Sequence, residues 1–266
     1  SNDIQLSTEC SAVSTENTAM KYRSWNWNVL IINGNDCEEI RKALDAALKE
    51  QERPTLIIGN CVMGKGCRDA EGKNLEHSCK THGAPLGKGA FENTIKNLGG
   101  NPDNPFVIYD DVKRLYDNRK KELQQIIAQR QAKEQKWAET HPKEAAKQVQ
   151  WFSGQLPAID WNSISVKNND ATRNASAAVL GVLAENVENM ICSSADLCNS
   201  DKTDGFLKKT RNIVKGDFGG KFFQAGVSEL TMACCCIGMM LHGGVHAAMG
   251  TFFVFSDYMK PAIRMA

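Results

Sequence analysis

The sequence contains no C-x-x-C pair, although ten of its 266 residues are cysteine. The spacings from Cys61 to Cys67 and from Cys192 to Cys198 have no neighbouring pair that would complete four tetrahedral ligands, which argues against a structural zinc site. The cysteines are also too scattered for the disulfide framework of a small secreted protein. Three consecutive cysteines, 234–236, lie inside an apolar run and are predicted to be small core side chains. This usage fits a reducing compartment, and we expect a cytoplasmic protein.

Blocks of positive charge are also absent. Lys and Arg number 32 against 31 Asp and Glu, and the formal net charge is +1. Without a basic patch in the sequence, neither a nucleic acid nor an anionic membrane surface is an expected partner. The first four residues, Ser1–Ile4, have neither the basic nor the apolar segment of a secretory signal.

The stretch Leu230–Ser256 carries no charged side chain and is long enough to cross a membrane as a helix. Glycine and histidine residues interrupt it at Gly238, His242, Gly243, Gly244, His246 and Gly250. Such interruptions favour a buried helix, a turn and a second buried element over a membrane span. We therefore expect no membrane segment.

The sequence does contain an alternation of strand and helix patterns. An apolar run at Trp27–Ile32 is followed by helical spacing at Cys37–Lys49 and by another apolar run at Thr55–Ile58. Asp36 is in the position of a helix cap, with Glu39 in the capping-box position. A strand, helix, strand unit with so short a crossover predicts a parallel sheet covered by helices.

A second α/β block begins at Asp170, which is predicted to cap a helix over Ala171–Asn186. Short apolar segments follow at Met190–Cys192 and Phe222–Phe223, and then an apolar helix at Ser228–Leu241. The order of elements again predicts parallel strands covered by helices. The predicted fold class is therefore α/β in both blocks.

A charged region separates the two blocks. Residues 110–150 are dense in Lys, Glu, Gln and Arg, which predicts an exposed helical connector with a narrow buried stripe. The predicted stripe consists of Leu115, Leu123, Ile126, Ile127 and Trp137. Residues 153–169, with several Asn and Ser, are interpreted as a linker.

A long loop rich in glycine is predicted for residues 59–89, after the second strand. Its start, Gly59–Gly66, nearly matches the phosphate-cradling pattern G-x-x-x-x-G-K-S/T. However, Gly66 replaces the hydroxyl residue that holds magnesium, and no helix pattern follows. A flexible active-site loop is favoured over a nucleotide P-loop. His82, near the end of this loop, is either a solvated histidine or an imidazole that donates to phosphate oxygens or moves protons near neutral pH.

Two charged residues lie at the starts of predicted helices in the second block. Arg173 falls in a first turn, where a cation opposes the helix dipole unless a bound anion reverses that sign; the alternative is a solvated arginine. Glu229 begins the apolar helix, where the dipole favours a carboxylate and the apolar surroundings suit a proton donor or acceptor. The aromatic residues between 252 and 258 are interpreted, on their own, as core side chains.

Taken in order, several stretches resemble the transketolase family. They are His82–Gly87, Ala171–Ser176, Ser194–Leu197, Gly226–Met232, Leu241–Gly244 and Thr251–Phe255. The resemblance extends over essentially the whole chain and implies a thiamine-diphosphate-binding fold of parallel sheets flanked by helices. It implies that residues 1–107 are the C-terminal part of the diphosphate-binding domain and that 108–169 are a charged helical interdomain connector and linker. Residues 170–266 would be the N-terminal part of the pyrimidine-binding domain.

The resemblance also implies a reaction. A transketolase transfers a two-carbon ketol unit from a ketose phosphate to an aldose phosphate in the pentose phosphate pathway, through a thiamine-diphosphate carbanion. Its cofactors are thiamine diphosphate and Mg²⁺ (or Ca²⁺), and its partners are sugar phosphates. A homodimer with the cofactor at the subunit interface is implied.

Roles for the residues of the second block follow position by position from the resemblance. Glu229 resembles the glutamate that bonds the pyrimidine ring nitrogen and promotes the imino tautomer. Asp196 resembles the acid on the thiazolium side. Phe255 resembles the aromatic that stacks on the pyrimidine, with Phe252 and Tyr258 completing its pocket.

The remaining roles concern the diphosphate, the metal and the substrate. His82 resembles the loop histidine near the diphosphate and the reacting carbonyl. Arg173 and Ser200 match residues that grip the sugar phosphate. Asn2 and the main-chain carbonyl of Ile4 align with the last metal ligands of the diphosphate motif.

The sequence also departs from the family pattern. The Gly-Asp-Gly portion that supplies the metal's carboxylate is not found, nor are the substrate histidines and arginine expected beyond Ala266, so this span alone is expected to be inactive. Alternatives are a related thiamine enzyme, such as a dihydroxyacetone synthase or a deoxyxylulose-phosphate synthase, and a non-catalytic module that contributes half a cofactor site. Arg173 and Ser200 together favour a phosphorylated sugar and the transketolase assignment.

Overall fold

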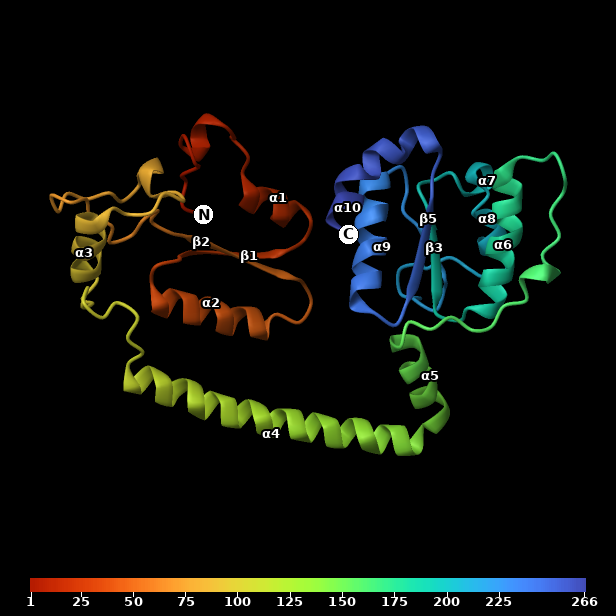
Figure 1. Ribbon diagram of the computed structural model, residues 1–266, viewed down its shortest axis with the longest axis horizontal. Coiled ribbons are helices and arrows are strands. Elements are labelled where there is room, and N and C mark those ends of the chain that lie inside the picture. Colours follow the sequence, from red (N-terminus) through yellow and green to blue (C-terminus); the bar gives the residue numbers. More distant parts are fainter. The chain divides into compact units, whose positions relative to one another are not determined.

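The computed structural model describes residues 1–266, which divide into two compact units, Ser1–Asn118 and Arg119–Ala266. In the first unit two strands and the helices beside them form a small α/β layer (Figure 1). Its elements are the 3-10 helix η1 (Cys10–Ala12), α1 (Thr18–Ser24), β1 (Asn28–Asn33), α2 (Cys37–Lys49), β2 (Thr55–Asn60), the 3-10 helix η2 (Cys79–Thr81) and α3 (Lys88–Asn97).

Strands β1 and β2 pair in parallel, from Asn28 opposite Thr55 to Asn33 opposite Asn60. This confirms the strand, helix, strand unit predicted from the sequence. Helix α2 makes the crossover between the two strands, as the short apolar runs on either side of it require.

The start of α2 is capped by Asp36, as predicted. Its Oδ1 accepts from the N–H of Glu38 at 2.8 Å and of Glu39 at 3.1 Å. The Glu39 amide is the largest of the influences that lower the pKa of Asp36. The capping-box prediction for Glu39 is wrong, because its carboxylate accepts from the N–H of Asn33 at 2.7 Å. The amide of Asp36 is already used, since it donates to the carbonyl oxygen of Asn33.

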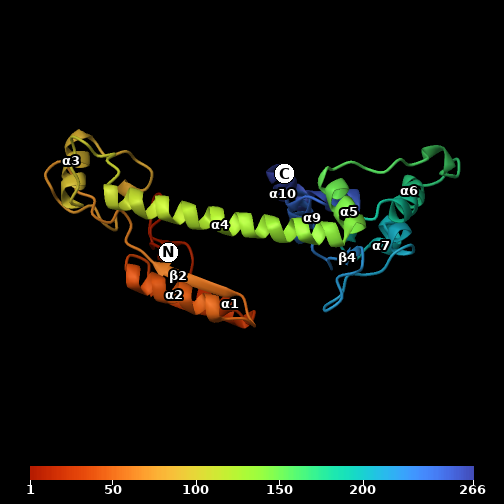
Figure 2. The ribbon, with the colours of Figure 1, turned by 90° about the horizontal axis from the view of Figure 1, so that it is seen from below.

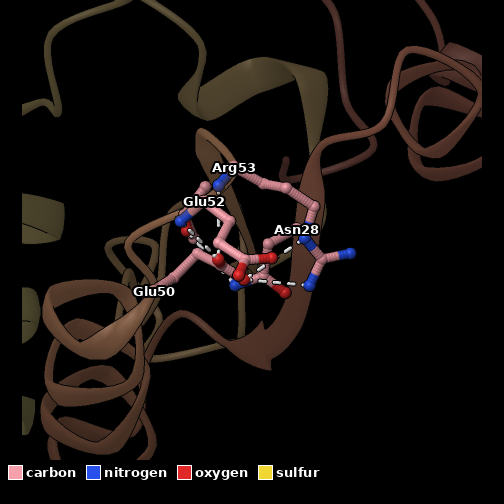
Figure 3. Close-up of polar contacts among 5 residues, drawn as sticks. Asn28, Glu50, Glu52 and Arg53 are labelled. Carbon is pink, nitrogen blue, oxygen red and sulfur yellow. Dashed lines mark hydrogen bonds and ion pairs between the residues drawn. The ribbon is translucent and has the colours of Figure 1, made fainter.

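The carboxylate of Glu50 holds the turn that leads from α2 into β2 (Figure 3). It accepts from the N–H of Glu52 at 3.0 Å and of Arg53 at 3.2 Å, and it pairs with the Arg53 guanidinium at 2.9 Å. The amide of Glu52 comes first among the groups that lower the pKa of Glu50. The turn aligns the start of β2 with β1, where the N–H of Asn28 donates to the oxygen of Pro54.

Helix α3 was missed by the sequence analysis. The predicted loop holds for residues 61–87 apart from the short η2, and α3 then begins at Lys88. Its N-cap is Gly87, which has no side chain to bond the first turn, so the usual signal for a helix start is absent. The helix is anchored by Thr94, whose hydroxyl accepts from the N–H of Arg68 at 2.9 Å.

The charged connector is helical, as predicted, and consists of α4 (Asp110–Thr140) and α5 (Pro142–Phe152). Figure 2 shows α4 as one uninterrupted helix. Pro142 has no N–H to continue the ladder of α4, and it takes the first position of α5. The predicted buried stripe is wrong: α4 has no buried residue, and Leu115 is 67% and Ile127 52% exposed.

The second unit contains a parallel sheet between two helical layers. Its strand order is β4-β3-β5, and both pairings are parallel, which confirms the predicted α/β class. Helices α9 and α10 lie on one face and α6, α7 and α8 on the other (Figure 1). After α5, its elements are η3 (Trp161–Ser163), α6 (Thr172–Asn186), β3 (Met190–Ser194), α7 (Cys198–Asp201), α8 (Asp204–Leu207), β4 (Phe222–Gln224), α9 (Glu229–His242), β5 (His246–Gly250), η4 (Phe253–Met259) and α10 (Lys260–Met265).

Each face of this sheet has its own apolar core. The buried residues of the first core are Ala184, Val187, Met190, Cys192, Phe206 and Phe222, and those of the second are Ala195, Met232, Ala233, Cys236, Met259 and Ala262. Successive side chains of β5 point to opposite faces of the sheet. Ala248 packs against the first core, and Ala247 and Met249 pack against the second. The sheet is therefore buried on both faces, as parallel sheets require.

The start of α6 differs from the prediction by one residue. Its N-cap is Ala171, which makes no side-chain cap, and not Asp170. The carboxylate of Asp170 accepts instead from the N–H of Ala171 at 2.8 Å and from the side-chain amide of Asn174 at 2.9 Å. The helix therefore begins without a side-chain bond to its first-turn amides.

The uncharged stretch Leu230–Ser256 forms most of α9, a glycine turn, β5 and part of η4, as the sequence predicted. No helix in the structure has both the length and the apolar composition needed to cross a bilayer.

Consecutive cysteines on α9 meet different surroundings. Cys236 is buried, Cys235 is partly buried and Cys234 is exposed. The core assignment is thus right for Cys236 and wrong for Cys234, because neighbours on a helix point about 100° apart. Burial raises the pKa of Cys236 to about 11 and that of Cys192 to about 12.

We expect these buried thiols to resist alkylation. At neutral pH, iodoacetamide should label the exposed Cys37, Cys61 and Cys234 in the folded protein, whereas Cys192 and Cys236 should react only after unfolding. Mass spectrometry of peptides from native and urea-treated samples measures this order. Labelling of Cys192 at the rate of Cys37 would contradict the burial of β3.

Candidate functional site

The carboxyl ends of β3, β4 and β5 lie in one row. Ser194 is opposite both Gln224 and Gly250, the last residues of the neighbouring strands. Three segments leave the strands at this edge: Ala195–Ser200, Ala225–Glu229 and Thr251–Phe255. They carry several of the predicted site residues. This edge is where parallel α/β sheets bind their ligands.

A cavity of about 420 Å³ opens at this edge. It is lined by Ala195, Asp196, Leu197, Val227, Glu229, Phe255 and Tyr258. Four of the predicted site residues, Asp196, Glu229, Phe255 and Tyr258, therefore surround one space, although they are separated by up to 62 positions in the sequence.

Glu229 is the buried acid of this cavity. It is the first residue of α9 and only 8% exposed. The helix dipole favours a carboxylate at this end of a helix. One of its oxygens, Oε1, accepts a hydrogen bond from the hydroxyl of Thr251 at 3.3 Å. The other oxygen is available to a ligand in the cavity.

Three aromatic rings form a row beside the cavity. Phe252 and Phe255 stack with centroids 6.1 Å apart and planes at 20°, and Phe255 and Tyr258 with 6.2 Å and 24°. The spacing of three follows from the 3-10 helix η4, in which residues i and i+3 lie on the same side. The interpretation as core is wrong for Tyr258, which is 62% exposed, and for Phe253, which is 93% exposed and lies off this row.

Asp196 reaches the cavity from a strained loop. It follows β3 directly, is exposed and has a φ of 64°, a left-handed conformation that Asp tolerates better than most residues. Such conformations persist where the surrounding structure holds them, often at functional sites.

Arg173 and Ser200 do not line this cavity. Ser200 lies half-buried on α7, and its hydroxyl donates to the side-chain oxygen of Asn199 at 3.2 Å. Arg173 is exposed in the first turn of α6, a turn that lacks a side-chain cap. The uncapped amides and the guanidinium favour an anion at this turn, whereas the carboxylate of Asp170, bonded to Ala171 and Asn174, opposes one.

Asn2, Ile4 and His82 belong to the first unit. The side chain of Asn2 accepts from the N–H of Ile4 at 3.2 Å and donates to the sulfur of Met63 at 3.2 Å. His82 follows η2 and is partly buried, and its N–H donates to the oxygen of Cys79 at 3.0 Å. No group of three or more His, Cys, Asp or Glu side chains gathers anywhere in the chain in a way that would hold a metal ion.

The glycine-rich loop Gly59–Gly66 is poorly suited to a nucleotide phosphate. The N–H of Gly66 donates to the carboxylate of Glu76 at 2.8 Å, and that amide is the largest influence that lowers the pKa of Glu76. A carboxylate therefore occupies the place where a P-loop receives phosphate, and it would repel a second anion. Gly64 and Gly66 have φ of 61° and 81°, which only glycine adopts readily.

Sequence reasoning quoted Thr251 and Val227 within the stretches that carry the resemblance but assigned them no role, and the structure places both around Glu229. The available signal for Thr251 was its place directly after a strand at the carboxyl edge of the sheet. That strand, β5, contains two alanines and ends in a glycine, so its sequence carries little strand propensity.

The parallel layers and the cavity at the carboxyl ends of the strands define a ligand-binding α/β protein. Residues 1–157 match the family model "Transketolase, thiamine diphosphate binding domain", and residues 169–266 match "Transketolase, pyrimidine binding domain". The chain belongs to the transketolase family.

Curated relatives and solved structures agree with this assignment. The chain is 34% identical to the transketolase of Staphylococcus aureus (strain MW2) over 271 residues, and 34% identical to that of Bacillus subtilis (strain 168) over 272 residues; each match covers 100% of this chain and 40% of the relative. The transketolase structure from Leishmania mexicana superposes with a TM-score of 0.85 at 27% identity, over 99% of this chain and 39% of that one. A Pichia stipitis transketolase in complex with sedoheptulose-7-phosphate gives 0.84 at 26% identity, over 99% of this chain and 40% of that one. The chain thus spans about 40% of the length of these relatives.

Proposed function

We propose that this chain supplies the pyrimidine-binding pocket, and part of the diphosphate-binding domain, of a transketolase that transfers two-carbon ketol units between sugar phosphates. The observation that carries the proposal is the buried carboxylate of Glu229, placed in a cavity beside an aromatic row in a chain of this family. We divide the chain into residues 1–107 of the diphosphate-binding domain, a connector at 108–169, and residues 170–266 of the pyrimidine-binding domain.

The cavity around Glu229 fits the aminopyrimidine half of thiamine diphosphate. The rings of Phe255 and Tyr258 line the cavity and suit a planar heterocycle, and Phe252 stacks on Phe255 beside it. The 420 Å³ cavity lies within the range of small-molecule sites. Val227 and Leu197 supply apolar walls, and Glu229 is the buried polar group that fixes orientation.

When bound, thiamine diphosphate supplies the carbon nucleophile that accepts and donates the ketol unit. Glu229 would share a proton between its second carboxylate oxygen and a ring nitrogen of the bound pyrimidine. Thr251 fixes the other oxygen, Oε1, by its hydrogen bond. Phe255 would hold the bound ring beside Glu229 by stacking, and Asp196 would place a carboxylate on the thiazolium side.

The diphosphate and metal half of the site fits these residues only in part. Asn2 and the carbonyl of Ile4 would contribute two oxygen ligands, whereas Mg²⁺ prefers six in octahedral geometry. The chain holds no acidic cluster that would supply the others. We propose that Mg²⁺ or Ca²⁺ is held by Asn2 and Ile4 together with ligands outside these residues, and that this span alone does not turn over substrate.

Sugar phosphates are the proposed substrates. Solved Pichia stipitis transketolases carry sedoheptulose-7-phosphate, xylulose-5-phosphate and fructose-6-phosphate. We assign the grip on the substrate's phosphate to Arg173 and Ser200, with the amides at the start of α6 adding to it. His82 is proposed to donate to the diphosphate and to the reacting carbonyl. A homodimer with the cofactor between subunits, acting in the cytoplasmic pentose phosphate pathway, completes the proposal.

The test combines mass and activity. The intact mass of the source polypeptide is measured, and the protein is assayed with thiamine diphosphate, Mg²⁺, xylulose 5-phosphate and ribose 5-phosphate. We expect a polypeptide more than twice 29.3 kDa that is active only with both cofactors. A 29.3 kDa protein that binds thiamine diphosphate without turnover would instead support a half-site module. Stabilisation by ATP and not by thiamine diphosphate would contradict the proposal and favour the nucleotide P-loop.

A further inference from the structure

The loop that leaves β3 is closed on itself by Asp201. The hydroxyl of Ser194, the fully buried last residue of β3, donates to Oδ2 of Asp201 at 2.7 Å and accepts from the N–H of Leu197 at 3.2 Å. The N–H groups of Ser200 and Asp201 in turn donate to the oxygen of Leu197 at 2.7 and 2.8 Å. The hydrogen bond between Ser194 and Asp201 thus joins the two ends of the loop that carries Asp196 and Ser200.

The second oxygen of Asp201 is also occupied. Its Oδ1 accepts from the N–H and from the hydroxyl of Thr203, both at 2.8 Å. Thr203 is 5% exposed. Hydrogen bonds to a carboxylate are shorter and stronger than those between neutral groups, so three donors on one side chain make a rigid closure.

Thr203 and Asp201 lie close to Gly250, the last residue of β5. A Cβ atom on Gly250 would lie 2.4 Å from Cγ2 of Thr203, which is shorter than real side-chain contacts, and 3.3 Å from Oδ2 of Asp201. The residue after Gly250 is Thr251, whose hydroxyl bonds Glu229. Asp201 is therefore bonded to the end of β3 through Ser194, and together with Thr203 it lies beside the end of β5.

We infer that Asp201 is a positioning residue, which fixes Asp196 for the cofactor and Ser200 for the sugar phosphate without touching either ligand. Asp201 does not line the cavity. Asp196 holds a left-handed φ of 64°, and its loop needs an external restraint to keep it there. The inference rests on the proposed function and adds the residue that holds two of its ligand groups in place.

The test uses the active polypeptide that contains these residues. In Asp201→Ala, the dissociation constant for thiamine diphosphate, followed by quenching of tryptophan fluorescence, and the KM for xylulose 5-phosphate should each rise about tenfold, because buried donors lose their acceptor. The kcat at saturation should change by less than about threefold, since no reacting group is removed. Asp201→Asn should recover part of both losses, because its oxygen still accepts from Thr203 whereas its amide leaves the buried hydroxyl hydrogen of Ser194 without an acceptor.

Asp217→Ala is the matched control. Asp217 is an exposed carboxylate in the same unit that pairs with Arg211 outside this loop, and its loss should leave both constants unchanged. If Asp201→Ala does not fold, Thr203→Val removes one donor while keeping the side-chain volume, and the same constants should rise about threefold.

The measurements on these variants distinguish failure of the inference from failure of the proposed function. Unchanged constants in the Asp201 or Thr203 variants, with a wild type that binds the cofactor, would overturn the inference alone. An Asp201→Asn variant as impaired as Asp201→Ala would also overturn it, since the acceptor geometry would then be insufficient. A wild-type polypeptide that binds no thiamine diphosphate would overturn the proposed function, and the inference with it.

Discussion

Replacing Glu229 by glutamine in the active polypeptide is expected to lower kcat by about 100- to 1,000-fold while the fold is retained. The amide has the same shape and can still accept from Thr251, so the hydrogen bond at Oε1 survives. It cannot exchange a proton with the pyrimidine ring nitrogen, and that exchange is the role proposed for the second oxygen. Steady-state kinetics with saturating thiamine diphosphate measure the effect.

Glu185→Gln is the control for this substitution. Glu185 is an exposed glutamate of α6 that pairs with Lys209 at 2.8 Å, with 53% of its side chain accessible. Surface pairs of this kind contribute little, so its kcat and melting temperature should match those of the wild type. A Glu229→Gln variant with near-normal turnover would remove Glu229 from the proposed mechanism.

The second large effect is expected at Gly205, where α8 approaches the backbone of α6. A Cβ atom there would lie 2.3 Å from the carbonyl oxygen of Ala177 and 2.8 Å from its carbonyl carbon. Both atoms belong to a helix backbone that cannot yield locally. Gly205→Ala should therefore destabilise the protein by about 2–3 kcal/mol, as overpacking does, and urea unfolding would measure this loss.

Gly238 offers the opposite case within the same unit. It lies in α9 with a right-handed φ, and a Cβ atom there would meet nothing within 4 Å. Gly238→Ala should raise stability by about 0.5–1 kcal/mol, because alanine loses less backbone entropy in a helix. Equal effects of the two substitutions would contradict the close approach of α6 and α8.

The proposed site residues are distributed over both units. The cavity with Glu229, Asp196 and the aromatic row is contained entirely in the second unit, whereas Asn2, Ile4 and His82 are in the first. Leu115 and Ile127 of α4 are exposed.

Local patterns in the sequence were sufficient for the elements that local physics dictates. Asp36 at the start of α2 and the apolar run of β1 were predicted because capping and apolar periodicity act over a few residues. The motif around Glu229 placed this carboxylate at the start of an apolar helix, which the structure bears out. Helix α3, by contrast, begins at a glycine that gives no capping signal, and it was missed.

By itself, the sequence determined the α/β class, the order of the main elements and the helical connector, since each depends on local spacing of apolar and capping residues. Only the tertiary structure decided what surrounds Glu229. The bond from Thr251, the closure of the loop by Asp201 and the stacking of Phe252, Phe255 and Tyr258 depend on strand register and on the three-residue turn of η4. It also decided that the stripe on α4 is exposed, because burial depends on what packs against a helix as well as on the helix's own pattern.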